Sequence, residues 1–119
     1  MLKYTEEHEW LQQDGDEVVV GITAHASEQL GDVVFVELPE VGREVEKGEE
    51  IVVIESVKAA SDIVAPIAGV ITAVNEDLPD NPGAVNDDAM KAWFFRIKPA
   101  AGESIDGFMD EAAYNALIG

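Results

Sequence analysis

The sequence predicts a mainly β protein in which two antiparallel sheets pack as a sandwich or a flattened barrel. Three observations support this prediction. Short Val- and Ile-rich runs alternate with turn residues along most of the chain. Helical spacing of apolar residues is confined to one short segment after the first hairpin and to the C-terminal end. Two segments on either side of residue 58 resemble each other, which fits a fold with two related halves.

The expected strands are bounded by Gly, Pro, Asn and Asp. Residues 14–16 read DGD, a turn sequence that tolerates positive φ, so the first two strands should form a hairpin. Residues 40–50 and 78–89 are rich in turn residues, and we expect irregular connections there. The expected strands cover residues 9–13, 17–23, 33–39, 49–57, 60–66, 69–75 and 92–99.

Two helices are expected. After the first hairpin, Thr23 is a suitable N-cap, Leu30 the last apolar contact and Gly31 a C-terminal stop. A C-terminal helix should begin near residue 106, with Asp106, Asp110 and Glu111 in its first turn, where the helix dipole favours carboxylates. Its apolar face should be formed by Phe108, Ala112, Ala116 and Leu117.

The internal repeat joins VVFVELPEVG (33–42) to SDIVAPIAG (61–69). Proline and glycine recur at strand ends for reasons of their own, so chance recurrence stays open as an alternative. In this alignment Val36, Pro39 and Gly42 match Ile63, Pro66 and Gly69.

Composition excludes several functions. The 119 residues predict one domain, residues 1–119, with one core. The net charge of −18, from 25 acidic and 7 basic residues, repels phosphate backbones and anionic membranes. It favours partners with basic faces, and a role in solubility alone stays open as the alternative. With no cysteine, a thiolate metal site or a catalytic thiol is excluded.

Neither a signal peptide nor an Arg-rich transit peptide is recognisable at the start, so we expect a cytoplasmic protein.

Enzyme motifs are absent from the sequence. It contains no G-x-G-x-x-G, P-loop or G-x-S-x-G pattern. His8 and Glu9 do not form the H-E-x-x-H zinc motif, because the second histidine is missing. His8 and His25 could meet in space, but two histidines and one glutamate are weak support for a metal, so we expect no metal site and no catalytic residue.

Lys58 is the residue that the pattern singles out. It lies between two apolar strands in a chain with few basic residues, flanked by Val57 and Ala59. A lysine amine is protonated at pH 7, so Lys58 should be a poor nucleophile by itself but a good acceptor for an enzyme that deprotonates and acylates it. An exposed turn with small neighbours suits such an acceptor. From the residues alone, an ordinary surface lysine remains an alternative.

The segment ESVKAASD (55–62) resembles the lipoyl-attachment motif of the glycine cleavage system H-protein family. Lipoyl domains of 2-oxo acid dehydrogenases usually have DKA at this turn and biotin carriers have MKM, whereas this chain has VKA. Further matching segments follow in the family's order over roughly residues 3–99. They are HEW (8–10), VGITAHASEQLGDVVFVELPEVG (20–42), SDIVAPIAGVITAVNEDL (61–78) and a Trp followed by an aromatic residue and RIKP (93–99), and DEAAYNAL (110–117) resembles the family's ending.

The resemblance implies a barrel-sandwich hybrid of two antiparallel sheets and a carrier rather than an enzyme. Lys58 would hold lipoate in amide linkage, placed there by a lipoyl or octanoyl transferase or ligase. The carrier would take an aminomethyl group from a pyridoxal-phosphate glycine decarboxylase to a tetrahydrofolate-dependent aminomethyltransferase. It would also pass electrons to dihydrolipoyl dehydrogenase. Neither nucleic acid nor a membrane is expected as a partner.

Three carboxylates near the expected attachment turn are further candidates. Glu55 precedes Lys58 by three residues and Asp62 follows it by four, so both could meet basic groups on a modifying enzyme. The resemblance also implies that the loaded arm folds back into a surface cleft, with Glu9 and the region of Asp62 as its contacts. The chain departs from the family before Trp93, where it reads DDAMKAW and lacks the usual Pro-Tyr, which puts the local loop conformation in question.

Two other functions stay open at this stage. An H-like carrier could relay octanoyl or lipoyl groups to other lipoyl proteins, again through Lys58, and activity with glycine decarboxylase would separate this role from glycine cleavage. An acidic β module that binds partners without being modified is the third possibility.

Overall fold

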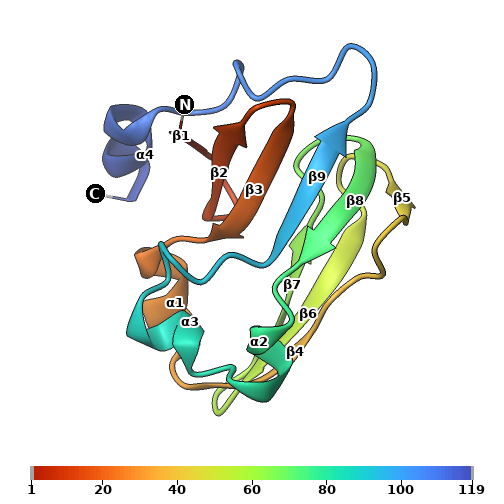
Figure 1. Ribbon diagram of the computed structural model, residues 1–119. Coiled ribbons are helices and arrows are strands. Elements are labelled where there is room, and N and C mark those ends of the chain that lie inside the picture. The colour runs from red at the N-terminus through yellow and green to blue at the C-terminus, as the bar shows by residue number, and fades with distance from the viewer. Residues whose placement is uncertain (1, 119) are drawn as a thin grey trace.

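The computed structural model describes residues 2–118, and most of these residues lie in nine strands and four helices (Figure 1). The strands are β1 (Leu2–Tyr4), β2 (Glu9–Asp14), β3 (Glu17–Ile22), β4 (Val33–Glu37), β5 (Glu44–Val45), β6 (Glu50–Ser56), β7 (Ala60–Val64), β8 (Gly69–Val74) and β9 (Phe95–Pro99). The helices are α1 (Ala24–Leu30), α2 (Asp77–Asp80), α3 (Ala84–Asp87) and α4 (Glu111–Ile118).

The strands form two antiparallel sheets, as the sequence predicts. The larger sheet has the order β1-β2-β3-β9-β8-β5, and the smaller has the order β4-β6-β7. Neither sheet closes on itself within residues 2–118, so the fold is an open sandwich rather than a closed barrel. Figure 1 shows the β6–β7 turn at one end of the molecule, while α4 lies beside β1 far from that turn.

Local sequence signals set the first hairpin and the helix after it. Residues Glu9 to Asp14 of β2 pair with Glu17 to Ile22 of β3 across the DGD turn, where Gly15 has a φ of 64°. The Thr23 side chain accepts a hydrogen bond from the Ala26 N–H and caps α1. Gly31 ends the helix with a φ of 77°, a conformation that glycine adopts without steric cost. The expected caps of this helix are confirmed.

The core lies between the two sheets. Alternate residues are buried in β8, in β9 and at the start of β3, which is the period expected of strands with one buried face. In β2 and β6 consecutive residues are buried, because both faces of these strands are partly covered. The largest fully buried apolar side chains are Leu11, Val18, Val20, Ile54, Ile67, Ile71, Leu78, Phe94, Phe95, Ile97 and Ile105.

A second, smaller apolar cluster holds the two ends of the chain together. The rings of Tyr4 and Tyr114 stack with centroids 4.7 Å apart, and Trp10 packs in the same cluster. Trp10 lies over Gly21, its partner on β3, where a Cβ would be only 2.5 Å from the indole ring. Its Nε1–H donates to the carbonyl of Ala89 at 3.0 Å. This hydrogen bond anchors residues 87–93 (DDAMKAW), the segment that lacks the Pro-Tyr usual in the family.

Several expectations about irregular segments are wrong. Residues 78–89 do not form an irregular loop, because Leu78 and Val85 are buried and fix the single-turn helices α2 and α3. Residues 40–50 contain the two-residue strand β5, which pairs with β8. Strand β1, which pairs with β2, was not expected from the sequence either.

The C-terminal helix is present, but it starts later and buries a different face from the one expected. It covers Glu111–Ile118, and Asp110 caps it by accepting a hydrogen bond from the Ala113 N–H at 2.8 Å. Tyr114 is the buried residue of this helix, whereas Ala112, Ala116 and Leu117 are exposed. The helix docks through an aromatic ring and its hydroxyl, which helical spacing of apolar residues does not reveal.

The two repeated segments become the outer strands of the smaller sheet. Strands β4 and β7 both pair with β6, and Val36 and Ile63 are both buried against the core. Gly42 has a φ of 93°, but Gly69 lies in a strand, so the glycines of the two copies are not equivalent. Among residues 2–118, the helices are all too short and too polar to cross a bilayer.

Candidate functional site: the Lys58 turn and the adjoining cavity

Lys58 lies in the turn between β6 and β7, and its side chain is exposed. Ser56 organises this turn. Its hydroxyl accepts hydrogen bonds from the N–H groups of Lys58 (3.2 Å) and Ala59 (3.1 Å) and donates to the carbonyl of Ala59 (3.0 Å). The Ser56 N–H also donates to the Ala59 carbonyl at 2.8 Å. The turn is therefore held by its own residues.

The turn is also tied to the end of helix α1. The Val57 N–H donates to the carbonyl of Asp32 at 3.0 Å. The Lys58 stem lies over Gly31, where a Cβ would be 3.2 Å from Cε and 3.6 Å from Nζ. The turn is exposed, as expected, and the lysine stem in addition rests on Gly31, the residue that ends α1.

A cavity of about 180 Å³ lies next to this resting position. It opens between β2, helix α1 and the β6–β7 pair. Leu30, the neighbour of Gly31, forms part of its wall, so the cavity begins one residue away from the contact with Lys58. Its lining residues are Glu7, His8, Glu9, Ile22, Ala26, Gln29, Leu30, Ile54, Ser61, Asp62 and Ile63.

Glu9 is the most unusual residue of the cavity. Its side chain is 2% exposed, and one carboxyl oxygen accepts a hydrogen bond from the Thr5 hydroxyl at 3.1 Å. The other oxygen, Oε2, has no hydrogen-bond partner within residues 2–118. Burial raises the pKa of Glu9 to about 8, with a smaller contribution from the negative charge of Glu7, while the Thr5 hydrogen bond opposes the shift. The carboxyl group is therefore mostly neutral at pH 7.

The cavity brings together two of the three candidate carboxylates. Glu9 and Asp62 both line it, from β2 and β7. Glu55 does not line it. Glu55 pairs with Phe35 on one side and Ala60 on the other, and all three are exposed on the outer face of the smaller sheet.

Next to the cavity, His8 and His25 do meet, with ring centroids 4.7 Å apart. Nδ1 of His8 lies 2.8 Å from the hydroxyl of Tyr114, which also lies 2.7 Å from the Thr23 hydroxyl. Burial, and then the nearby His25, lower the pKa of His8. No group of three or more His, Asp or Glu side chains in residues 2–118 is arranged to hold a metal. The pair instead links the N-terminal strands to α4.

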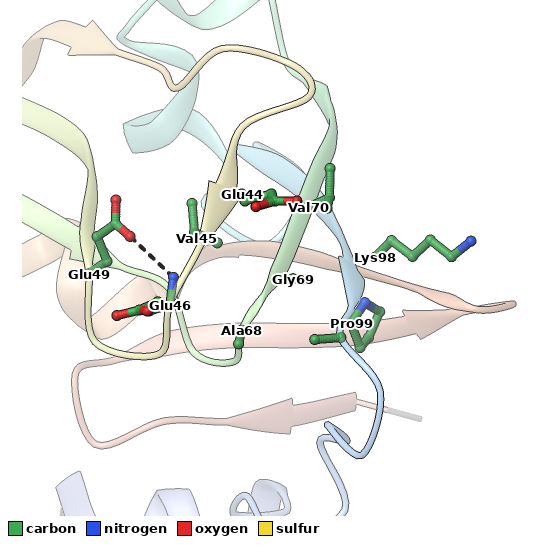
Figure 2. Close-up of a pocket in the computed structure, with 10 residues that line it drawn as sticks. Glu44, Val45, Glu46, Glu49, Ala68, Gly69, Val70, Lys98 and Pro99 are labelled. Atoms are coloured by element: carbon green, nitrogen blue, oxygen red, sulfur yellow. Dashed lines mark hydrogen bonds between the residues drawn. The ribbon is translucent and has the colours of Figure 1, made fainter.

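A larger hollow lies elsewhere on the described surface. It has a volume of about 590 Å³ and lies over β5, β8 and the end of β9 (Figure 2). Figure 2 shows Lys98 extending away from the carboxylates of Glu46 and Glu49. None of the candidate residues lines this hollow, and its acidic groups lie at an open surface, where water solvates them.

Two features of the site were missed in the sequence. The contact between Gly31 and Lys58 joins residues far apart in the chain, although the positive φ expected for a C-terminal glycine was a signal that a side chain could pass close to it. The burial of Glu9 had no signal, because a lone glutamate at the start of a strand is normally solvated.

Comparisons with known proteins identify the family of this chain. The sequence model of the family described as "Glycine cleavage H-protein" matches residues 2–119. The glycine cleavage system H protein of Thiobacillus denitrificans is 52% identical over 118 residues, which cover 98% of this chain and 92% of that protein. The corresponding protein of Burkholderia cenocepacia is 54% identical, with coverages of 98% and 94%.

A solved structure shows the same fold. The crystal structure of a glycine cleavage system H protein from Mycobacterium marinum superposes with a TM-score of 0.88 at 38% identity, covering 99% of this chain and 96% of that one. The chain belongs to the glycine cleavage H-protein family. This confirms the family and the two-sheet fold that the sequence indicated.

Proposed function

We propose that this protein is the lipoyl carrier of a glycine cleavage system and that lipoate is attached to Lys58. The observation that carries the attachment site is the position of this lysine. It is exposed in the hydrogen-bonded turn of a hairpin, and its stem lies over Gly31, whose neighbour Leu30 lines the cavity that contains Glu9. In this proposal residues 1–119 form one lipoyl-carrier domain, and the protein is a carrier, not a catalyst.

Attachment requires an outside enzyme. An amide bond forms when the neutral Nζ of Lys58 attacks the carbonyl carbon of an activated acyl group. The amine gives up a proton to a base on the enzyme, and the activating thiol or nucleotide leaves with the bonding electron pair. Ser56 holds the backbone of the turn and keeps the amine within reach, and the neighbouring Ala59 and Ala60 leave room around it.

The residues beside the turn fit a long apolar arm with a polar end. Ile22, Leu30, Ile54 and Ile63 give the cavity apolar walls, and Glu9 is also part of its lining. The Oε2 atom of Glu9 is buried and has no hydrogen-bond partner within residues 2–118. Buried polar atoms without partners are costly, so this carboxyl group favours a ligand that reaches and bonds to it. The 180 Å³ volume suits a thin chain rather than a bulky ring system.

When attached, lipoate supplies a disulfide that accepts the aminomethyl group and the electrons released in glycine cleavage. The expected partners are a pyridoxal-phosphate glycine decarboxylase, a tetrahydrofolate-dependent aminomethyltransferase, dihydrolipoyl dehydrogenase and the acylating enzyme. By tethering the arm, the carrier raises its effective concentration at each active site.

Glu9 is proposed to bind a cationic amine that enters the cavity. A positive charge next to Oε2 lowers the pKa of this carboxyl group, so Glu9 ionises and releases a proton as the amine binds. The resulting ion pair is desolvated, which makes the attraction stronger than in bulk water. Asp62 lines the same cavity and provides a second acceptor from β7.

The attachment site is tested by co-expressing the protein with a lipoylating enzyme and mapping the modified peptide by mass spectrometry. We expect one added lipoyl group on Lys58. Lys58→Arg should fold normally, because an exposed turn residue contributes little packing, and should carry no lipoate. Modification at Lys47 or Lys91, or no modification of the parent protein, would contradict the proposal.

The role of Glu9 is tested by loading the lipoylated protein with methylamine and timing its spontaneous breakdown without the transferase. Glu9→Ala should speed the breakdown and leave lipoylation of Lys58 unchanged. Glu55→Ala is the matched control, because Glu55 lies on the outer face of the sheet and does not line the cavity. Equal decay of Glu9→Ala and the parent would show that Glu9 does not shelter the amine.

A further inference from the structure

Three large apolar side chains are exposed beside the Lys58 turn. Val34, Phe35 and Val57 have exposed fractions of 55%, 44% and 66%, and together we call them the turn patch. Their backbone segments are neighbours in the smaller sheet. Val57 donates its N–H to the Asp32 carbonyl just before β4, and Phe35 of β4 pairs with Glu55 of β6. In Figure 1 the start of β4 lies at the same end of the molecule as the β6–β7 turn.

The patch results from an irregularity in β4. The pairing of β4 with β6 shifts register between Val33 and Phe35, which is the mark of a β-bulge. In a regular strand, neighbouring residues point to opposite faces. Here Val34 and Phe35 are both exposed, while Val33 and Val36 on either side are 4% and 1% exposed. The bulge therefore exposes one more apolar side chain than a regular edge strand would. The packing of the core does not explain this exposure.

The surroundings of the turn patch are acidic. Glu55 is directly opposite Phe35, and Asp32 and Glu37 are exposed at the two ends of β4. A second copy of this chain, itself carrying a charge of −18, would bring like charges together around the patch, which is unfavourable. A complementary partner would have an apolar binding surface surrounded by lysine or arginine side chains.

We propose that the turn patch is the docking surface for the enzyme that acylates Lys58. The acylating enzyme acts on Nζ itself, which lies only one side-chain length from the backbone of the turn. The surface of this enzyme must therefore cover the residues around the turn. An enzyme that acts on the far end of an attached arm can work without touching them. Aromatic side chains are enriched in protein interfaces, so Phe35 is the expected anchor, and Val34 and Val57 would exclude water around it.

This inference rests on the proposed attachment at Lys58, and its test separates the two. The apo protein is acylated by a purified lipoyl or octanoyl transferase or ligase, and the rate is measured for the parent and for the double variant Val34→Ser, Phe35→Ser. Both substitutions lie outside the ESVKAASD segment. We expect kcat/KM to fall about tenfold or more, chiefly through KM, because loss of an apolar anchor weakens binding rather than chemistry.

The matched control is Leu117→Ser. Leu117 is 51% exposed on α4, far from the turn (Figure 1), and its loss should change the rate by less than about twofold. Direct binding provides a second readout. Lys58→Arg cannot be acylated but retains the turn patch, so it should still bind the enzyme, and adding Val34→Ser to it should weaken that binding. Thermal unfolding identifies a variant that does not fold, and Val34→Ser alone then replaces the double variant.

The outcomes are distinct. Acylation of the parent at Lys58 together with an equal rate in the double variant would overturn the docking surface and leave the attachment site standing. The docking surface would also be overturned if the parent protein were a dimer in solution and the double variant a monomer, because a second copy of the chain would then cover the patch. No acylation of the parent would overturn the proposed function, and the docking surface with it.

Discussion

The stem of Lys58 lies across Gly31, the residue that ends helix α1. A Cβ on Gly31 would be 3.2 Å from Cε and 3.3 Å from Cδ of the lysine, and Gly31 has a φ of 77°. The glycine therefore serves two purposes, since it ends the helix and leaves space for the lysine. The two contributions can be separated by mutation.

Gly31→Ala should lower the free energy of unfolding by about 1 kcal/mol, because alanine is strained at this φ. The contact with Lys58 should add little, since the end of a flexible side chain can move. The cost of Gly31→Ala should therefore be the same in a Lys58→Ala background, measured by urea unfolding. A cost that disappears in that background would show that the lysine contact, not the backbone, limits this position.

Glu9 should make stability depend on pH. Its pKa is about 8 in the folded protein and 4.5 in its ordinary state, so between these values the folded protein holds more protons than the unfolded chain. The free energy of unfolding should therefore fall as pH rises from 4.5 to 8. The loss should be about 1.4 kcal/mol for each pH unit in this window, or several kcal/mol in all.

Urea unfolding of Glu9→Gln at several pH values tests this dependence. Glutamine resembles the neutral carboxyl group and does not titrate, so the variant should lose that part of the slope and exceed the parent in stability at pH 8. Glu55→Gln, an exposed glutamate that does not line the cavity, is the control and should keep the slope. A Glu9→Gln profile parallel to that of the parent would mean that Glu9 titrates normally in the folded protein.

Tyr114→Phe should lower the free energy of unfolding by about 1–3 kcal/mol, because it removes a buried hydroxyl that bonds to the buried Thr23 and the half-buried His8. The Tyr114 hydroxyl bonds to His8 and Thr23, and the side chain is 4% exposed. Tyr4→Phe is a suitable control, since Tyr4 stacks on the same ring but its hydroxyl makes no hydrogen bond within residues 2–118. If both variants unfold at the same urea concentration, the hydroxyl network does not hold α4.

The acidic surface should steer association with partner enzymes. Charge attraction is screened by salt, with a Debye length of about 8 Å at physiological ionic strength. The apparent KM of the lipoylated protein with glycine decarboxylase should therefore rise as salt is added. A KM that does not respond to salt would restrict the net charge of −18 to a role in solubility.

The features that the sequence predicted well are those with local causes. Thr23 and Gly31 mark the ends of α1 because their effects on capping and φ act within a few residues. The position of Lys58 in a turn followed from the apolar runs on both sides. The helices α2 and α3 were missed because Pro79 and Pro82 indicated a loop, whereas tertiary burial of two apolar residues decides the conformation there.

The features that the sequence could not predict depend on contacts between distant elements. The cavity joins residues of β2, α1 and β7, and the raised pKa of Glu9 is a result of that assembly. The bulge in β4 also left no mark in VVFVE, which reads as an ordinary strand with alternate residues buried. For Glu9 the family resemblance indicated a role, but only the structure shows the burial and the unpartnered oxygen that give this role a physical basis.

Helix α1 contacts both the lysine and the cavity. Ala26, Gln29 and Leu30 form part of the cavity wall, and the next residue, Gly31, supports the Lys58 stem. One short helix and the glycine that ends it thus provide both surfaces. An arm attached to Lys58 as proposed would need only rotations about its own bonds to lie along them, and a partner enzyme would withdraw such an arm without first reshaping the protein.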